Sequence, residues 1–275
     1  MKHSIICFLF AVVMLASGCR TNDLPSEGLD SETREKNGGI IILTSNRTDG
    51  IINLSMDALE RDRGNIWIDL DNNRIRAKDG SEDVNAFDGY RNYTVAPGVN
   101  RISIYGNITY LGAACNKLTE IDISGNTRLN TLNIPFNELS VVDVSRNEAL
   151  LRLDVSENKL NILELSSNSG LISLSCFNNR IGEIDLSHNI RLSFLDCSGN
   201  ELSSLNISAN TQLTKVIAYN NRLTMLDISN NPLLRSLWVF GNLLNDTETA
   251  RIRTAFKGTD SAELWLNETN SPTHE

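Results

Sequence analysis

The hydrophobic positions of residues 108–244 recur every 21 residues, in the unit L-x-x-L-x-C/V-x-x-N-x-L-x-x-L-D-L-S-x-N-x-x. One apolar column consists of Ile108, Leu129, Leu150, Leu171, Leu192, Leu213 and Leu234. A first asparagine column consists of Asn116, Asn137, Asn158, Asn179, Asn200, Asn221 and Asn242. A second asparagine column consists of Asn126, Asn147, Asn168, Asn189, Asn210 and Asn231. A fixed period of this length predicts stacked repeats that bury their apolar sides against one another.

Each repeat contains a short extended segment, such as 153–155, whose alternate residues point to the same side. Stacked coils can pair these segments in a parallel ladder with a spacing of about 4.8 Å. A second extended segment, such as 163–165, leaves no room for a convex helix, so we expect a flat, weakly curved β-solenoid. The asparagines are expected to be scaffold residues, because an amide can satisfy both donors and acceptors of turn backbone.

The outward positions of the second extended segments form an acidic column. Its members are Asp122, Asp143, Glu164, Asp185, Asn206 and Asp227. A metal-binding ladder is one interpretation of this column, and solvation of the surface is the one that we favour.

The repeat resembles the leucine-rich repeat. Cys176 and Cys197 occupy the inward third apolar position of consecutive coils, which is similar to the repeats of internalin J and related bacterial surface proteins. Only these two coils carry the cysteine here. We expect both to be buried free thiols that act as small apolar residues. The resemblance implies recognition of a protein ligand on a host or bacterial surface.

The segments on either side of the repeats are expected to cap the open ends of the solenoid. Residues 38–107 predict a small β-rich N-terminal cap, with extended runs at 39–43, 50–54, 65–70 and 100–105. Residues 245–275 predict a C-terminal cap. Asn245 and Glu248 form a capping box that opens a short helix through Lys257, and 262–266 suggest a closing strand.

The N-terminal sequence is typical of a secretory leader, with a short basic start and an apolar run over 5–16. Residues 1–18 are interpreted as a signal peptide. The following Cys19 resembles the lipobox cysteine of bacterial lipoproteins, which implies cleavage before it and lipidation of its sulfur. Residues 19–37 are polar and predict a flexible tether. We therefore expect a lipid anchor in the bacterial envelope, at the outer membrane and surface exposed; an unlipidated signal peptide is the alternative.

Charge and histidine content exclude several function classes. The formal net charge is −9, from 25 basic and 34 acidic residues, which argues against a nucleic-acid partner. His188 is the one histidine away from the chain ends, so the sequence offers neither a multi-histidine metal site nor much acid–base chemistry. We expect a non-catalytic protein that needs no cofactor.

One loop weakly resembles a calcium-binding loop in the spacing of its oxygen-bearing residues. Asp69, Asp71 and Asn73 alternate as calcium ligands do. Arg74 stands where an EF-hand has glycine, and Gly80 stands where it has glutamate. We therefore favour a structural turn and expect no bound metal.

The outward positions around the first extended segment change character along the repeats. Those of the early coils are small or polar, whereas the later coils supply a candidate partner-binding patch of Phe177, Phe194, Ile217, Tyr219, Trp238 and Phe240. A contiguous aromatic patch marks an interaction site, and aromatic residues dominate interface hot spots. The sequence thus predicts a protein–protein interaction surface for adhesion or host interaction. A glycan-binding module, a purely structural envelope lipoprotein and a patch covered by the C-terminal cap remain alternatives.

Overall fold

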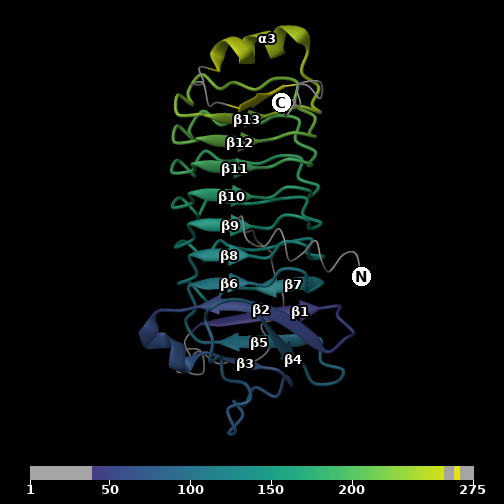
Figure 1. Ribbon diagram of the computed structural model, residues 1–275, viewed down its shortest axis with the longest axis vertical. Helices are drawn as coiled ribbons and strands as arrows, with labels where there is room; N and C mark the ends of the chain where they lie inside the picture. Colours follow the sequence, from purple (N-terminus) through teal and green to yellow (C-terminus); the bar gives the residue numbers. More distant parts are fainter. Residues whose placement is uncertain (1–38, 257–262, 267–275) are drawn as a thin grey trace, which may run out of the picture.

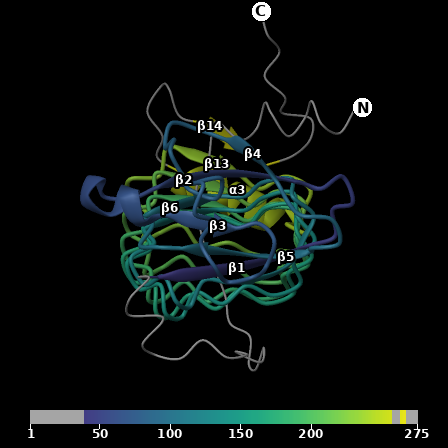
Figure 2. The same ribbon diagram turned by 90° about the horizontal axis from the view of Figure 1, so that it is seen from below.

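The computed structural model describes residues 39–256 and 263–266, which form a straight β-solenoid (Figure 1). Seen along the long axis, the coils lie over one another (Figure 2). The solenoid strands are β6 (Tyr110–Gly112), β8 (Thr131–Asn133), β9 (Arg152–Asp154), β10 (Ser173–Ser175), β11 (Phe194–Asp196), β12 (Lys215–Ile217), β13 (Ser236–Trp238) and β14 (Glu263–Trp265). The other elements are β1 (Ile40–Ser45), β2 (Ile51–Asp57), the 3₁₀ helix η1 (Glu60–Asn65), β3 (Trp67–Asp69), β4 (Arg91–Thr94), β5 (Arg101–Tyr105), β7 (Leu118–Asp122) and α3 (Asp246–Ala255). The predicted fold class is confirmed.

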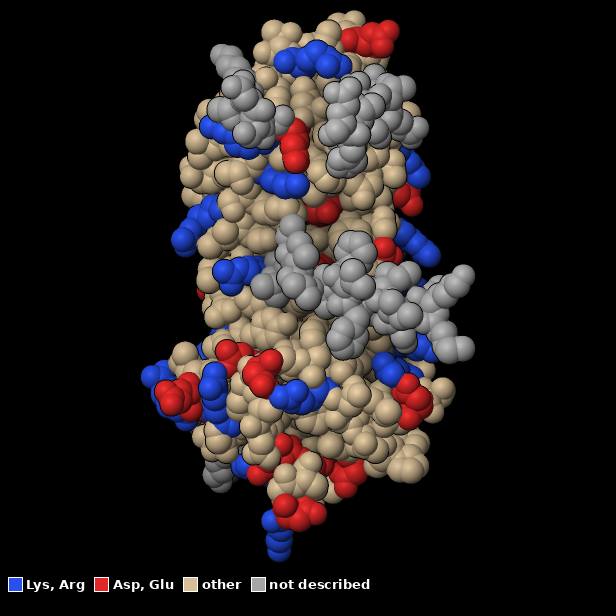
Figure 3. All heavy atoms as spheres, in the orientation of Figure 1, with Lys and Arg blue, Asp and Glu red and all other residues tan. Residues whose placement is uncertain are grey.

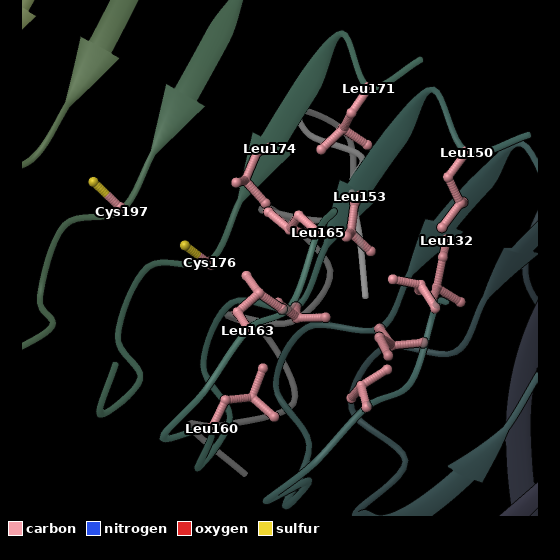
Figure 4. Close-up of a cluster of buried hydrophobic side chains, with 14 of the residues drawn as sticks. Leu132, Leu150, Leu153, Leu160, Leu163, Leu165, Leu171, Leu174, Cys176 and Cys197 are labelled. Carbon is pink, nitrogen blue, oxygen red and sulfur yellow. The ribbon is translucent and has the colours of Figure 1, made fainter. Parts of the chain in front are cut away.

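A ten-stranded sheet runs the length of the molecule, in the order β14-β13-β12-β11-β10-β9-β8-β6-β2-β4. The strands from β6 to β14 are parallel and in register, so Leu132, Leu153 and Leu174 lie side by side. These leucines are fully buried. Their side chains and those of neighbouring coils form one continuous apolar core (Figure 4).

The asparagine columns are scaffold, as predicted. Asn179 accepts the backbone N–H of Leu160 on its Oδ1 at 3.0 Å, and its Nδ2 donates to the carbonyls of Val155 and Cys176. Asn168, in the second column, donates from Nδ2 to two carbonyls of the preceding coil. Each amide therefore ties one coil to the next.

The turn after each strand requires a left-handed backbone at the residue before the ladder asparagine. This position is filled by Cys115, Phe136, Glu157, Asn178, Gly199, Asn220 and Gly241, all with positive φ. Left-handed backbone favours glycine and asparagine. At Gly199, a Cβ would lie 2.0 Å from the Oδ1 of Asn178, so a larger residue there would have to displace the Asn178 side chain.

The second extended segments alternate in burial but do not pair as strands within the described repeats, except in the first coil. There β7 pairs with β1 of the N-terminal cap. The acidic column forms local turns instead of a ladder. The Oδ1 atoms of Asp143 and Asp185 each accept the backbone N–H of the serine two residues later, and Asn206 does the same. This geometry explains the column by turn formation.

The N-terminal strands close one end of the solenoid. An antiparallel sheet in the order β3-β5-β1-β7 lies on one side, while β2 pairs with β6 and so extends the solenoid sheet. Charged side chains gather around this end, whereas along the visible face of the solenoid they are scattered among uncharged residues (Figure 3).

The helix α3 covers the other end of the solenoid (Figure 1). Asn245 is the N-cap, and its side chain accepts the N–H of Glu248 at 2.9 Å. The Glu248 carboxylate accepts the backbone N–H of Leu226 in the last coil, so it ties the helix to the solenoid. Ile252 is fully buried. The predicted helix is confirmed, but it ends at Ala255 with Phe256 as the C-cap.

Cys176 and Cys197 are free and fully buried, as predicted. Figure 4 shows the two cysteines at matching positions of adjacent coils. Burial raises the pKa of each thiol, so neither is an activated nucleophile.

Candidate interaction surface

The outward side of the parallel sheet changes from polar to aromatic along the solenoid. In-register pairing brings one column of outward residues together, namely Gly112, Asn133, Asp154, Ser175, Asp196, Ile217, Trp238 and Trp265. The column therefore runs from small and polar groups near the N-terminal cap to two indoles at the C-terminal end.

The C-terminal part of this face is built from stacked rings, which we call the aromatic face: Tyr219, Trp238, Phe240 and Trp265. Tyr219 and Phe240 lie parallel, with ring centroids 4.7 Å apart and planes 4° apart. The indoles of Trp238 and Trp265 lie 5.3 Å apart, and Trp265 also contacts Phe240 at 6.3 Å. The stacking distance matches the spacing of paired strands, so the repeat itself orders the rings.

Charged side chains flank the indole of Trp238. The ammonium of Lys215 lies 4.3 Å from the ring centroid, in a cation–π contact. The Glu263 carboxylate accepts hydrogen bonds from the Trp238 indole N–H at 3.2 Å and the Ser236 hydroxyl at 2.9 Å. The Ser236 hydrogen bond and Lys215 lower the pKa of Glu263, so this carboxylate is ionised at neutral pH.

The other predicted patch residues occupy different environments. Phe177 and Phe194 are half-buried on the same face, but Ser198 separates Phe177 from Tyr219. Ile217 is 7% exposed and therefore adds little to the surface. The structure therefore brings Tyr219, Trp238 and Phe240 into the ring contacts of the aromatic face. Ile217 lies opposite Trp238 but is buried, whereas Phe177 and Phe194 lie on earlier coils.

Trp265 belongs to the aromatic face although the repeat pattern did not include it. It lies on β14, which pairs with β13 so that Trp265 is opposite Trp238. The helix α3 interrupts the 21-residue period before β14, so the repeat pattern does not show that Trp265 is equivalent to Trp238. The repeated Leu-Trp pair, at 237–238 and 264–265, is the sequence signal that points to it.

The polar half of the face is tightly packed near the N-terminal cap. A Cβ at Gly112 would lie 2.6 Å from the Tyr110 hydroxyl and 2.7 Å from that of Tyr90, so the glycine makes room for both. On the next strand Asn133 is 1% exposed, and its Oδ1 has no hydrogen-bond partner within the described part of the chain.

Asp154 is a buried carboxyl in the same polar column. Its Oδ1 accepts the backbone N–H of Ser156, whose hydroxyl lies 2.8 Å from that of Ser175. Burial raises the pKa of Asp154 to about 7, and it also raises the pKa of Asp196. No such perturbed carboxyl was expected from the sequence, because its cause is burial on a face that the repeat pattern marks as outward.

In the loop considered as a calcium site, the carboxylates accept hydrogen bonds from backbone N–H groups. The carboxylate oxygens of Asp69, Asp71 and Glu82 lie within 4.8 Å of one another, so Glu82 joins the two predicted aspartates. The side chain of Asn73 donates from Nδ2 to Asp71 at 2.7 Å. Both Asp69 oxygens accept backbone N–H groups, from Asn73 and Arg74, and both Glu82 oxygens do likewise. Hydrogen bonds to backbone amides are what a structural turn needs, and they account for these buried carboxylates.

The predicted leader and Cys19 lie outside the described residues. Across 39–256 and 263–266, no helix is long and apolar enough to cross a bilayer.

The stacked 21-residue coils, the parallel inner sheet and the asparagine ladders define a β-solenoid of the leucine-rich-repeat type. The chain is similar to the functional domain of InlJ from Listeria monocytogenes, described as including a cysteine ladder, at 35% identity and a TM-score of 0.46. That match covers 50% of this chain and 35% of the other. It is also similar to an internalin, InlF, from the same species, at 22% identity and a TM-score of 0.49, over 53% and 44% of the two chains.

This chain thus spans less than half the length of either protein. The LVIVD repeat family matches residues 98–133, where the N-terminal cap meets the first coils. No curated protein matches the chain.

Proposed function

We propose that this protein is a non-catalytic binding protein that docks a protein partner on its aromatic face. The observation that carries the proposal is the ordered cluster of Tyr219, Trp238, Phe240 and Trp265 on the outward side of the sheet. Aromatic residues supply large contact areas and dominate interface hot spots. The similarity to internalins supports a role as a surface repeat protein in adhesion or host interaction.

The ring geometry favours a protein over a glycan. Sugars pack on open ring faces, but Tyr219 and Phe240 cover one face of each other. Lys215 and Trp265 both contact the indole of Trp238, from strands on opposite sides of it. These contacts therefore cover at least one face of each ring and leave less open ring face for a sugar, which favours the apolar and aromatic side chains of a protein.

Replacing Trp238 and Tyr219 together by alanine tests this function. The double variant and the wild type are immobilised as full chains and probed with surface proteins of host cells and bacteria, and with a glycan array. We expect the double variant to lose about 2 kcal/mol of affinity or more for a captured protein, which is about thirtyfold. Arg152→Ala, an exposed change on the polar half, is the matched control.

Two results would contradict the proposal. Undiminished capture by a double variant that still unfolds cooperatively would place the binding site elsewhere. Ligands found on the glycan array alone, and lost in the double variant, would favour a carbohydrate partner.

We also propose that Cys19 carries a lipid anchor, which tethers the protein to the bacterial outer membrane with the solenoid surface exposed. The leader pattern and the cysteine after Ala-Ser-Gly support this localisation.

A further inference from the structure

The indole of Trp238 is held from three directions. Its Nε1 donates to the Glu263 Oε2 at 3.2 Å, Lys215 Nζ lies 4.3 Å from its centroid, and the Trp265 ring lies 5.3 Å away. Lys215 belongs to β12 and Trp265 to β14, the two strands that flank β13. The ammonium and the second indole therefore reach Trp238 from strands on opposite sides of β13, while the carboxylate accepts the indole N–H.

A short side chain between the two charges makes this arrangement possible. Lys215, Ser236 and Glu263 are consecutive members of one in-register column. The outer two residues belong to strands about 10 Å apart, so their long side chains must meet above the middle strand. Ser236 leaves that space open, and its hydroxyl donates to the Glu263 Oε2 at 2.9 Å. Lys215 Nζ lies 3.7 Å from the same oxygen.

We propose that Glu263 is a positioning residue: together with Lys215 it fixes the orientation of the Trp238 indole, so that β14 completes the partner-binding surface instead of only closing the sheet. The inference rests on the proposed function for its biological meaning, because the oriented indole is what a partner would meet. Aromatic side chains that are already ordered lose less conformational entropy on binding. Isolated exposed ion pairs contribute little to stability, so the expected effect is on indole orientation.

Full-length Glu263→Ala and Glu263→Gln variants test the positioning role without any ligand. Acrylamide quenching of tryptophan fluorescence reports on Trp238 and Trp265, because the third tryptophan, Trp67, is 5% exposed. We expect Glu263→Ala to increase quenching and to weaken the near-ultraviolet dichroism of the indole pair. Quenching and dichroism of Glu263→Gln should lie between those of the wild type and of Glu263→Ala. Its amide oxygen can still accept the indole N–H, but the neutral side chain no longer attracts Lys215.

Glu138→Ala is the matched control. It removes another exposed glutamate–lysine pair, with a distance of 3.0 Å to Lys159, several coils from the aromatic face. Its quenching and dichroism should equal those of the wild type. A urea midpoint for each variant separates a local change of the indole from a general loss of folding.

Acidification supplies an independent readout. The Ser236 hydrogen bond and Lys215 lower the pKa of Glu263, so wild-type quenching should stay low until the pH falls below the ordinary range of glutamate. Quenching should then rise in the wild type, and this transition should be absent from Glu263→Gln.

The outcomes separate the positioning role from the proposed function. A Glu263→Ala variant with wild-type quenching and dichroism overturns the positioning role, whatever binds the protein. Altered spectra in the Glu263 variants, combined with unchanged partner capture by the Trp238 and Tyr219 double variant, support the positioning role and overturn the proposed function.

Discussion

At the residue scale, the two asparagine columns contribute differently to the scaffold. Asn179 uses both amide atoms, because its Oδ1 accepts an N–H and its Nδ2 donates to carbonyls. In the second column the Oδ1 atoms of Asn126, Asn147, Asn168, Asn189, Asn210 and Asn231 are buried without a partner within the described coils. Each asparagine of the first column therefore makes hydrogen bonds to both N–H and C=O groups of the buried turns, whereas those of the second column bond to C=O groups.

Asn179→Ala is expected to lower the free energy of unfolding by about 1–3 kcal/mol, because buried turn groups lose their partners. Among them is the backbone N–H of Leu160. Urea denaturation measures the change, with the exposed Asn161→Ala as the control. A midpoint equal to that of the wild type would contradict the ladder role of Asn179.

Asp154 should make stability depend on pH. Burial raises its pKa in the folded protein to about 7 from the ordinary value of 3.8, so the folded state disfavours the ionised form. The free energy of unfolding should therefore fall as the pH rises from about 4 to 7, by roughly 4 kcal/mol at most. Asp154→Asn should reduce this slope, leaving the part due to Asp196, and stabilise the protein at pH above 7.

Urea titrations of wild type and Asp154→Asn at several pH values measure the difference. The matched control is Asp143→Asn, because at the equivalent position of a later coil Asn206 already accepts the N–H of the serine two residues on. Parallel pH profiles for wild type and Asp154→Asn would show that this carboxyl titrates normally.

At the element scale, α3 ends the solenoid by bonding to the backbone of the last coil. Glu248 accepts the N–H of Leu226, and Arg251 donates to its carbonyl at 2.8 Å. Ile252 inserts its side chain into the core. The helix thus supplies both polar partners and apolar cover at the end of the stack.

Ile252→Ala should lower the free energy of unfolding by about 2–5 kcal/mol, because it leaves a cavity under the helix. Hydrogen exchange should show the largest loss of protection in the last coil, since each repeat contacts only its neighbours. Arg253→Ala, an exposed change on the same helix, is the control. Equal loss of protection in the first and last coils would contradict a local capping role.

At the scale of the whole molecule, the solenoid is a stack closed by two different caps. The N-terminal cap pairs strands with the first coil on both sides, through β2–β6 and β1–β7. The C-terminal cap adds a helix and then the strand β14, which carries part of the aromatic face. The proposed binding surface consequently lies at the end of the solenoid away from the N-terminus of the described chain.

The proposed lipid anchor predicts that Cys19→Ser moves the protein from the membrane fraction to the soluble fraction of bacterial cells. The acyl chains contribute about 0.8 kcal/mol per buried CH₂ group, so their loss removes the anchor. Cys7→Ser, a cysteine change within the leader, is the control. A Cys19→Ser protein that still sediments with membranes would contradict lipidation at this residue.

The solenoid, the asparagine ladders and the inward cysteines could be predicted from the repeat pattern alone, because each depends on a 21-residue period that every coil shares. Tyr219, Trp238 and Phe240 could be placed on one face for the same reason. Which of the outward residues stay exposed depends on how the folded chain packs, because burial is set by contacts in space: Ile217 is 7% exposed, and Asp154 is buried enough to shift its pKa.

Trp265 and Glu263 join the aromatic face through strand pairing that the 21-residue repeat does not predict. The helix α3 separates β14 from the repeats in sequence, yet strand pairing returns Trp265 and Glu263 to the side of Trp238. Likewise, β7 is a paired strand because β1 lies beside it, whereas the equivalent segments of later coils have no such partner among the described residues. Pairing between distant segments is the physical step that a repeat pattern does not contain.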